Sequence, residues 1–280
     1  MISMEKVQFR YGRKAPLFAG LNLELQSDTI YGLLGKNGAG KTTLLKLLCG
    51  LRFAEFGRIT IMGYSLETRD PALMEEIFIV PEKFPSPAVK VSQYARIHGE
   101  LYPRFDSAAF ESYVAEFELD RDQKIAEMSY GQKKKSLLAF GLATNTSVLI
   151  LDEPTNGLDI PSKGQFRRLL AGAANESRTI LISTHQVRDM ENLIDPIVIL
   201  DEGKVVFNHS VDEVTDRLVM AISPEPLVGA VYSEQTLGGF ASVAPRDGGA
   251  ATRLDLEMLF NAVTSHPAEL DQIFAKEESQ

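Results

Sequence analysis

One octapeptide constrains the fold of this chain more than any other stretch, because residues 35–42 read GKNGAGKT. It follows a short apolar run, TIYGLLG, and leads into TTLLKLLCGL, whose apolar residues recur at helical spacing. Glycines let the backbone bend so that successive N–H groups point at a phosphate chain, and the positive end of a helix adds to the attraction. The pattern therefore predicts a buried strand, a phosphate-binding loop and a helix, in that order.

Individual positions of this loop suit parts of a nucleoside triphosphate and its cation. The ammonium group of Lys41 can reach the β and γ phosphate oxygens, and the hydroxyl group of Thr42 can bind Mg²⁺. The backbone of the loop is expected to surround the phosphates. The expected nucleotide-binding residues of this segment are Gly35, Lys36, Asn37, Gly38, Ala39, Gly40, Lys41, Thr42 and Thr43.

Short aliphatic runs alternate with helical stretches through the centre of the chain. VLILDEP at 148–154 and TILISTH at 179–185 read as buried strands, and the stretch at 161–175 between them reads as a helix. This alternation predicts an α/β fold with a mostly parallel sheet covered by helices.

Two regions depart from that pattern before the middle of the chain. Residues 2–12 and 21–27 alternate apolar and polar side chains, which indicates half-buried strands joined by the loop GRKAPLFAG in an N-terminal antiparallel β subdomain. Residues 84–140 turn helical, with amphipathic stretches at 91–102 and 107–119, which indicates a helical insertion.

The composition shifts again near residue 216. Prolines and glycines gather between 223 and 250 among short strand-like pieces such as GAVYS, and LDLEMLFNAVTS at 254–265 reads as a closing helix. The sequence therefore predicts two domains, a larger one at 1–215 and a small α+β accessory domain at 216–280.

Two adjacent carboxylates, Asp152 and Glu153, follow the apolar run VLIL. Carboxylates at the end of a buried strand are costly unless they meet a cation or take part in chemistry, and an ordinary strand-end turn is the alternative interpretation. Because adjacent strand residues point in different directions, the two are expected to differ in role. Asp152 is the better partner for Mg²⁺ through a water molecule, and Glu153 is the better candidate to align and deprotonate an attacking water.

The composition of the 280-residue chain excludes several functions. A formal net charge of -9 opposes binding to a phosphate backbone, so no nucleic acid partner is expected. No apolar run approaches the about 18 residues that cross a bilayer. The first residues show no secretory signal pattern, and one cysteine offers no disulfide framework, so a cytoplasmic location is expected.

The segment AEMSYGQKKK at 126–135 contains two conflicting features. Ser129 and Gln132 predict a helix that begins with a capping box. Three consecutive lysines at 133–135 nevertheless crowd the positive end of the same helix, where each cation is unfavourable by a few tenths of a kcal/mol. The segment is therefore either an ordinary helix start or one half of an anion site whose other half lies elsewhere, which would place all three lysines near an anion.

GKNGAGKT, SYGQ, LILDEP, NGLD and STH occur in the order and spacing typical of the ATP-binding subunits of ABC transporters. The resemblance covers roughly residues 1–215 and is strongest to bacterial export-type subunits that carry a short C-terminal extension. It implies a P-loop NTPase core and a head-to-tail pair, with ATP between the phosphate loop of one chain and the Ser129 segment of the other. Hydrolysis would open the pair, which would drive an integral-membrane permease from the inner face of the cell membrane. The second chain would be another copy or a paralogous ABC subunit.

The resemblance also implies roles for residues outside the phosphate loop. Tyr11 would stack on adenine instead of packing as a hairpin tyrosine, and His185 would contact the γ-phosphate instead of serving as a turn residue. Asp159 would link the two sites of the pair, and it could also cap the helix that follows it. The expected catalytic residues are Glu153, His185 and Lys41, and those that face the nucleotide from the second chain are Ser129, Gly131 and Gln132.

Two residues depart from the family pattern. Glu82 stands where glutamine is common, and a carboxylate only accepts hydrogen bonds at neutral pH, although it can bind Mg²⁺ or a water. Tyr130 replaces the first glycine of L-S-G-G-Q, so its ring must either pack against the partner or limit how tightly the pair closes. The expected metal ligands are Thr42, Glu82 and Asp152.

Two alternatives to transport stay open. The first is a soluble ABC ATPase that acts on a ribosome, a DNA end or a cluster-assembly complex. The known proteins of that kind usually have tandem cassettes, very long coiled coils or a basic surface, and this sequence has none of them. The second is a slow-turnover regulatory nucleotide-binding module, which Glu82 and Tyr130 suggest.

Overall fold

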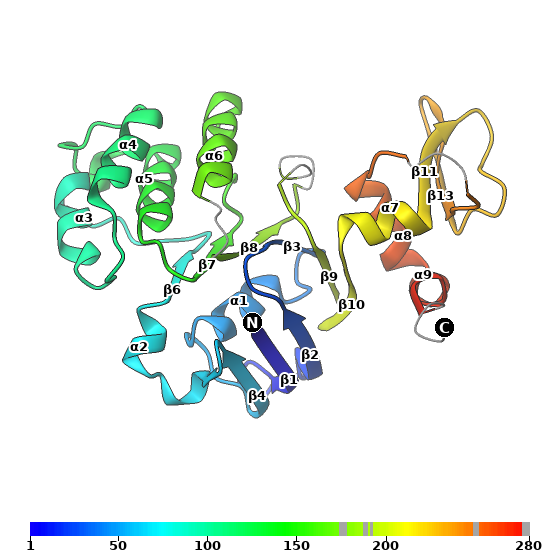
Figure 1. The fold of residues 1–280 in the computed structure, drawn as a ribbon, viewed down its shortest axis with the longest axis horizontal. Coiled ribbons are helices and arrows are strands. Elements are labelled where there is room, and N and C mark those ends of the chain that lie inside the picture. The colour runs from blue at the N-terminus through cyan, green and yellow to red at the C-terminus, as the bar shows by residue number, and fades with distance from the viewer. Residues whose placement is uncertain (174–177, 187–189, 191–192, 249–251, 276–280) are drawn as a thin grey trace.

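Six strands form the central sheet of the structure, a computed structural model that describes residues 1–173, 178–186, 190, 193–248 and 252–275 (Figure 1). These strands are β3 (Ile30–Leu34), β6 (Ile77–Val80), β7 (Val148–Asp152), β8 (Thr179–Thr184), β9 (Ile197–Asp201) and β10 (Lys204–His209). They pair in the order β10-β9-β3-β8-β7-β6, and all neighbours run parallel except β9 and β10. The predicted mostly parallel sheet is confirmed. Its strands β7 and β8 are buried along their whole length, which explains why they read as unbroken apolar runs.

An antiparallel sheet and helix α1 (Lys41–Leu48) cover one face of the central sheet. The antiparallel sheet contains β1 (Ile2–Phe9), β2 (Phe18–Leu25), β4 (Phe56–Ile61) and β5 (Tyr64–Ser65), in the order β2-β1-β4-β5. A hydrophobic cluster joins it to α1 and to the central strands. The predicted loop at 12–20 is too long, because β2 begins at Phe18, whose side chain is buried and whose backbone pairs with Phe9.

A group of helices forms the predicted insertion and lies beyond β6 and β7 (Figure 1). Phe140 is at its centre, with its ring against those of Phe78, Tyr94, Phe105 and Phe110. The insertion contains α3 (Val91–Gly99), α4 (Ser107–Glu116), the 3₁₀ turn Ile125–Glu127 and most of α5 (Tyr130–Ala143). Helix α6 (Ile160–Ala173) packs beside α5 but lies outside the predicted bounds. The shorter α2 (Pro71–Met74) and the 3₁₀ turn Leu66–Thr68 precede the insertion, and their residues Leu73 and Leu66 belong to the hydrophobic cluster of α1. Of the helix predicted at 161–175, the last two residues lie outside the described residues.

The C-terminal unit packs against the far edge of the central sheet. It contains α7 (Val211–Arg217), β11 (Leu218–Ser223), β12 (Tyr232–Thr236), β13 (Gly239–Pro245), α8 (Leu256–Ser265) and α9 (Pro267–Ala275), with sheet order β11-β13-β12. The prediction that one helix closes this unit is wrong, because Pro267 starts a second helix one residue after the first ends. Phe274 of α9 lies 5.1 Å from Phe207 of β10, between ring centroids. The last five residues of the predicted domain lie outside the described residues.

The predicted α/β fold class is therefore confirmed, with its parallel core, N-terminal antiparallel sheet, helical insertion and α+β extension. In the part of the chain that the structure describes, no helix is both long and apolar enough to cross a membrane.

Candidate nucleotide site

The phosphate loop bends sharply between β3 and α1. Gly38 and Gly40 have φ angles of 88° and 112°, in the left-handed region that favours glycine. A side chain at position 40 would also come within 2.8 Å of the ring of Phe18. Gly40 occupies the N-cap position of α1, and as a glycine it offers no capping side chain. The N–H groups of the first turn can therefore face an anion.

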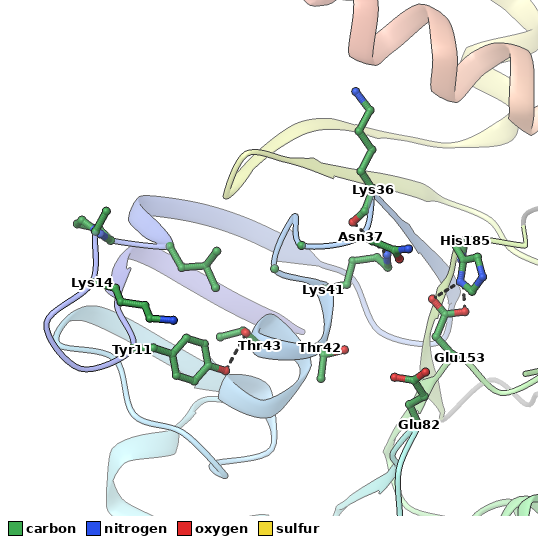
Figure 2. Close-up of a pocket in the computed structure, with 15 residues that line it drawn as sticks. Tyr11, Lys14, Lys36, Asn37, Lys41, Thr42, Thr43, Glu82, Glu153 and His185 are labelled. Carbon is green, nitrogen blue, oxygen red and sulfur yellow. Dashed lines mark hydrogen bonds and ion pairs between the residues drawn. The ribbon is translucent and has the colours of Figure 1, made fainter.

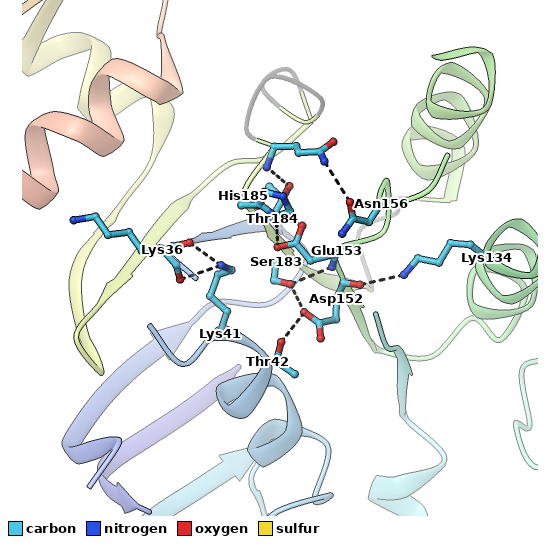
Figure 3. Close-up of polar contacts among 12 residues, drawn as sticks. Lys36, Lys41, Thr42, Lys134, Asp152, Glu153, Asn156, Ser183, Thr184 and His185 are labelled. Carbon is cyan, nitrogen blue, oxygen red and sulfur yellow. Dashed lines mark hydrogen bonds and ion pairs between the residues drawn. The ribbon is translucent and has the colours of Figure 1, made fainter. Parts of the chain in front are cut away.

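Lys41 lies inside the curve of this loop and is only 8% exposed. Its Nζ donates to the carbonyl oxygen of Gly35 at 2.6 Å and to that of Lys36 at 3.4 Å (Figure 3). Burial lowers the pKa of Lys41, whereas the carboxylates of Glu153, Asp152 and Glu82 raise it. Lys41 is thus a buried cation beside three carboxylates, at the position predicted to meet the β and γ phosphates.

Asp152 is held by two hydroxyl groups at the end of β7. The Oγ of Ser183, at the end of β8, donates to its Oδ1 at 2.6 Å, and the Oγ1 of Thr42 donates to the same oxygen at 3.3 Å. Ser183 was not among the predicted site residues, although it belongs to the quoted STH motif. The ends of neighbouring parallel strands lie at the same edge of a sheet, so the position of Ser183 near the end of a predicted strand could have placed it beside Asp152.

Whereas the side chain of Asp152 points toward Thr42, that of Glu153, the first residue after β7, points toward His185. Its Oε1 lies 2.8 Å from Nδ1 of His185 (Figure 2). Its backbone has a φ of 47°, which is unusual for a residue with a side chain. The N–H group of Glu153 also approaches the carbonyl oxygen of Ser183 at 3.1 Å, so β8 supports this bend.

Lys41, Thr42, Glu153 and His185 open onto one cleft of about 600 Å³, whereas Asp152 lies behind Thr42 and does not line it. Tyr11 lies at one end, 40% exposed, with its hydroxyl 3.0 Å from Oγ1 of Thr43. Its ring packs edge-on against Phe9, at 4.9 Å between centroids. Glu82 lies at the other end, with its carboxylate toward Glu153 (Figure 2). The cleft is lined by Tyr11, Lys14, Ala15, Pro16, Leu17, Lys36, Asn37, Gly38, Gly40, Lys41, Thr42, Thr43, Glu82, Glu153 and His185.

The residues that were predicted to bind a metal offer suitable donors. The hydroxyl of Thr42 and the carboxylate of Asp152 are in contact, and Glu82 lines the same cleft as Thr42. Hydroxyl and carboxylate oxygens are the hard donors that Mg²⁺ prefers. The donor chemistry therefore fits the predicted cation.

The remaining predicted residues face a separate cavity of about 420 Å³. Ser129 begins α5, and its predicted capping box with Gln132 is confirmed, since the side chain of each bonds the backbone of the other. Oδ1 of Asp159 accepts from the N–H of Ser162 at 2.9 Å, which confirms its capping interpretation. The same contacts with Ser162 lower the pKa of Asp159. This cavity is lined by Ser129, Gly131, Gln132, Lys135, Gly157, Leu158, Asp159 and Ser162.

The three lysines of α5 do not share one environment, so the interpretation that places all three near one anion does not hold for Lys134. Lys135 lines the cavity of Ser129, whereas Lys133 lines an apolar groove near Leu137. Lys134 is fully buried, because its Nζ donates to the carbonyl oxygens of Pro81 and Asp152, each at 3.2 Å. Burial lowers the pKa of Lys134 to about 8, against the opposing effect of nearby carboxylates.

The ring of Tyr130 packs on its own chain. It stacks on Phe84, with centroids 5.7 Å apart and planes at 25°. Its hydroxyl donates to the carbonyl oxygen of Glu82 at 2.9 Å. A Cβ on Gly157 would lie 2.4 Å from this ring, so the two residues are in close contact. The side chain is nevertheless 48% exposed.

The sheet, the glycine loop and the cleft beside it define the class of this molecule, a P-loop nucleotide-binding protein. Comparison with known proteins identifies the family of this chain within that class. The chain belongs to the ABC transporter family, which matches residues 18–156, and it is an ATP-binding subunit with an ABC-type ATPase domain.

Two proteins of similar sequence have names that describe ATP-binding proteins. The Nod factor export ATP-binding protein I of Burkholderia lata is 33% identical over 212 residues, which cover 73% of this chain and 69% of that protein. The ABC transporter ATP-binding protein YtrB of Bacillus subtilis is 29% identical over 201 residues, which cover 71% and 68%.

Solved structures share the fold. An ATP-binding subunit of an ABC transporter superposes with a TM-score of 0.68 at 24% identity, over 76% of this chain and 91% of that one. A dimeric ATP-binding cassette in a post-hydrolysis state, bound to ADP and Pi, gives a TM-score of 0.66 at 20% identity, over 75% and 99%.

Proposed function

We propose that two chains enclose ATP and Mg²⁺ head to tail, and that hydrolysis and reopening of this pair energise a membrane transporter working in the export direction. The partner chain is a second copy or a paralogous ABC subunit. The export direction is supported by the relative that is named as an export ATP-binding protein. The head-to-tail pair of two chains is supported by the geometry of the site.

One observation carries the proposal: the predicted ATP-binding residues of one chain line two separate cavities. Lys41, Thr42 and Glu153 open onto the first, whereas Ser129 and Gly131 open onto the second. A single ATP that contacts both sets must therefore lie between two chains, with the second cavity of one facing the first cavity of the other.

The residues of the first cavity can perform in-line hydrolysis. Glu153 accepts a proton from the attacking water, and His185 holds the carboxylate of Glu153 in place. Lys41 neutralises charge on the phosphate oxygens, and the first turn of α1 adds its N–H groups. Held by Thr42, Asp152 and Glu82, Mg²⁺ would neutralise further negative charge on the transferred group.

An apolar groove supports docking onto a membrane partner. It has a volume of about 300 Å³ and lies between the segment after Glu82 and the helical insertion, where Phe84, Tyr94 and Leu137 line it. A helix end of a permease with exposed apolar side chains would suit this groove. The groove borders Glu82 in sequence, so docking there is close to the ATP cleft.

The two predicted domains are part of the proposal. Residues 1–215 would form the nucleotide-binding domain and 216–280 an accessory domain. The expected boundary near 216 falls at the end of α7 (Val211–Arg217), the helix that connects the central sheet to β11, and the small sheet of the accessory domain begins directly after it at Leu218.

The pair can be tested by light scattering of the purified chain. The Glu153→Gln variant should be a monomer alone and a dimer with ATP and Mg²⁺. Adding Ser129→Arg should abolish the dimer while leaving ADP binding to the monomer unchanged, because the bulky cation enters only the second cavity. A dimer that persists in the double variant would contradict the head-to-tail arrangement.

The transport role needs a membrane experiment. The tagged chain, purified from detergent-solubilised membranes, should retain a polytopic membrane protein, and the reconstituted complex should hydrolyse ATP faster than the isolated chain. Retention of a ribosome or DNA complex in place of a membrane protein would favour the non-transport alternative. Absence of measurable steady-state hydrolysis would favour the regulatory one.

A further inference from the structure

Two side chains on one face of α5 hold the backbone on both sides of Glu82. Tyr130 and Lys134 are four positions apart and therefore lie one above the other on the helix. Tyr130 donates to the carbonyl oxygen of Glu82 at 2.9 Å, and Lys134 donates to that of Pro81 at 3.2 Å. These carbonyls belong to the two planar peptide units that flank the Cα of Glu82. Together the two bonds fix the direction in which the Glu82 side chain leaves the backbone.

Phe84 adds further contacts between α5 and the segment 81–84. Its ring stacks on Tyr130, and Nζ of Lys134 lies 5.8 Å from the ring centroid. Both arrangements are favourable for an aromatic ring. The segment 81–84 therefore cannot move relative to α5 without losing several contacts at once.

Lys134 also connects α5 to β7, the strand that leads into Glu153. Its Nζ donates to the carbonyl oxygen of Asp152 at 3.2 Å (Figure 3). That carbonyl belongs to the peptide unit that leads into Glu153, whose φ of 47° is an unfavourable conformation that its surroundings must maintain. One buried ammonium group thus bridges the backbone before Glu82 and the backbone before Glu153.

We propose that Tyr130 and Lys134 are positioning residues, which orient Glu82 and Glu153 and thereby couple the position of α5 to hydrolysis. The inference rests on the proposed function, in which the Ser129 end of α5 faces the ATP of the other chain. When that ATP draws the start of α5 toward it, the displacement passes through Tyr130 and Lys134 to the carboxylates of the same chain. ATP at one site of the pair therefore promotes hydrolysis at the other.

Steady-state kinetics of three variants tests the coupling. Tyr130→Phe removes one hydroxyl and keeps the ring, so it should lower kcat about threefold to tenfold, the range expected for one hydrogen bond. Lys134→Met should lower kcat by about 10²-fold, because it frees both backbone segments. In both variants the Hill coefficient for ATP should fall toward 1 while calorimetric ADP affinity stays within about twofold of wild type. Lys204→Met is the control, since it removes an exposed lysine charge on β10, outside these contacts, and should preserve kcat and the Hill coefficient.

The outcomes separate this inference from the proposed function. A wild-type chain that forms no ATP-dependent dimer contradicts the proposed function. A wild-type dimer that hydrolyses ATP without cooperativity overturns the coupling alone. The coupling is also overturned if Tyr130→Phe retains wild-type kcat and Hill coefficient. This variant tests the coupling even if Lys134→Met fails to fold. A merely structural role for Tyr130 would lower the unfolding temperature and leave the Hill coefficient unchanged.

Discussion

Both carboxylate oxygens of Glu153 are approached by His185. The imidazole Nδ1 lies 2.8 Å from Oε1, and the backbone N–H group donates to Oε2 at 3.4 Å. Glu153 is only 7% exposed, so these contacts and the bend at the end of β7 determine where its carboxylate points. The orientation of the proposed general base therefore depends on a residue that directly follows β8, the next strand of the sheet.

The first prediction concerns the base itself. Glu153→Gln keeps the size of the side chain but cannot accept a proton, so turnover should fall about 10²-fold to 10⁴-fold, the usual contribution of a general base. ATP binding, measured by calorimetry, should stay intact. Glu118→Gln is a suitable control, because Glu118 also has a positive φ but is exposed on the helical insertion. Wild-type turnover in Glu153→Gln would show that another group acts as the base.

The second prediction concerns Ser183, whose Oγ donates to Asp152 at 2.6 Å. Ser183→Ala should raise the Mg²⁺ concentration needed for half-maximal hydrolysis about tenfold or more, as losing a supporting hydrogen bond to a metal ligand commonly does. The effect is checked by a Mg²⁺ titration at saturating ATP. Ser242→Ala removes a buried hydroxyl in the C-terminal unit and should leave the Mg²⁺ dependence unchanged. An unaltered titration in Ser183→Ala would contradict the assignment of Asp152 to the cation.

The sequence predicted those parts of the site that depend on local pattern. The glycine loop and the carboxylate pair could be predicted because each motif is contiguous in sequence with the helix or strand that positions it. Gly40 directly precedes α1, and Asp152 is the last residue of β7. Ser183 was missed, because its contact with Asp152 depends on which strands are neighbours in the sheet. The roles assigned to individual site residues stay predictions.

The lysines of α5 show the limit of a one-dimensional pattern more clearly. Their charges suggested a common anion, yet Lys134 points into the interior and Lys135 lies at the Ser129 cavity. Consecutive helix residues are about 100° apart around the axis, so three neighbours meet three different surroundings. Only the packing of α5 against Pro81 and β7 decides which side chain is buried.

The third prediction concerns the close approach of Gly157 to Tyr130. Gly157 has a φ of 80°, and a Cβ there would lie 2.4 Å from the ring of Tyr130. Gly157→Ala should therefore lower the free energy of unfolding by about 2–4 kcal/mol, from backbone strain and overpacking together. In a Tyr130→Ala background the loss should shrink to about 1 kcal/mol, since only the backbone strain remains.

Urea unfolding of the four chains measures this double-mutant cycle. Gly172→Ala is the control, because no atom of the described residues lies within 4 Å of a Cβ at that position of α6, so alanine should be neutral or stabilising there. An equal loss for Gly157→Ala with and without Tyr130 would show that the ring can move aside at no cost.

The fourth prediction is a pH dependence located in the contact between the C-terminal unit and the central sheet. The ring of His209 of β10 packs against that of Phe274 of α9, with centroids 4.3 Å apart and planes tilted by 33°, and its Nδ1 lies 3.3 Å from Oε2 of Glu213. Burial lowers the pKa of His209 below its ordinary value of 6.5, Arg217 lowers it further, and Glu213 and Asp271 oppose the change. A histidine with a lower pKa in the folded state binds protons more readily when unfolded.

The contribution of His209 to stability is therefore complete above pH 6.5 and is lost as the pH falls from 6.5 through the lower pKa of the folded state. His209→Phe keeps a ring against Phe274 but cannot bind a proton. The difference in unfolding free energy between the variant and wild type, measured in urea, should be constant at alkaline pH. It should change in favour of the variant as the pH is lowered below 6.5. Parallel pH profiles for the two proteins would show that His209 titrates alike in the folded and unfolded chains, which would contradict the lowered pKa of His209.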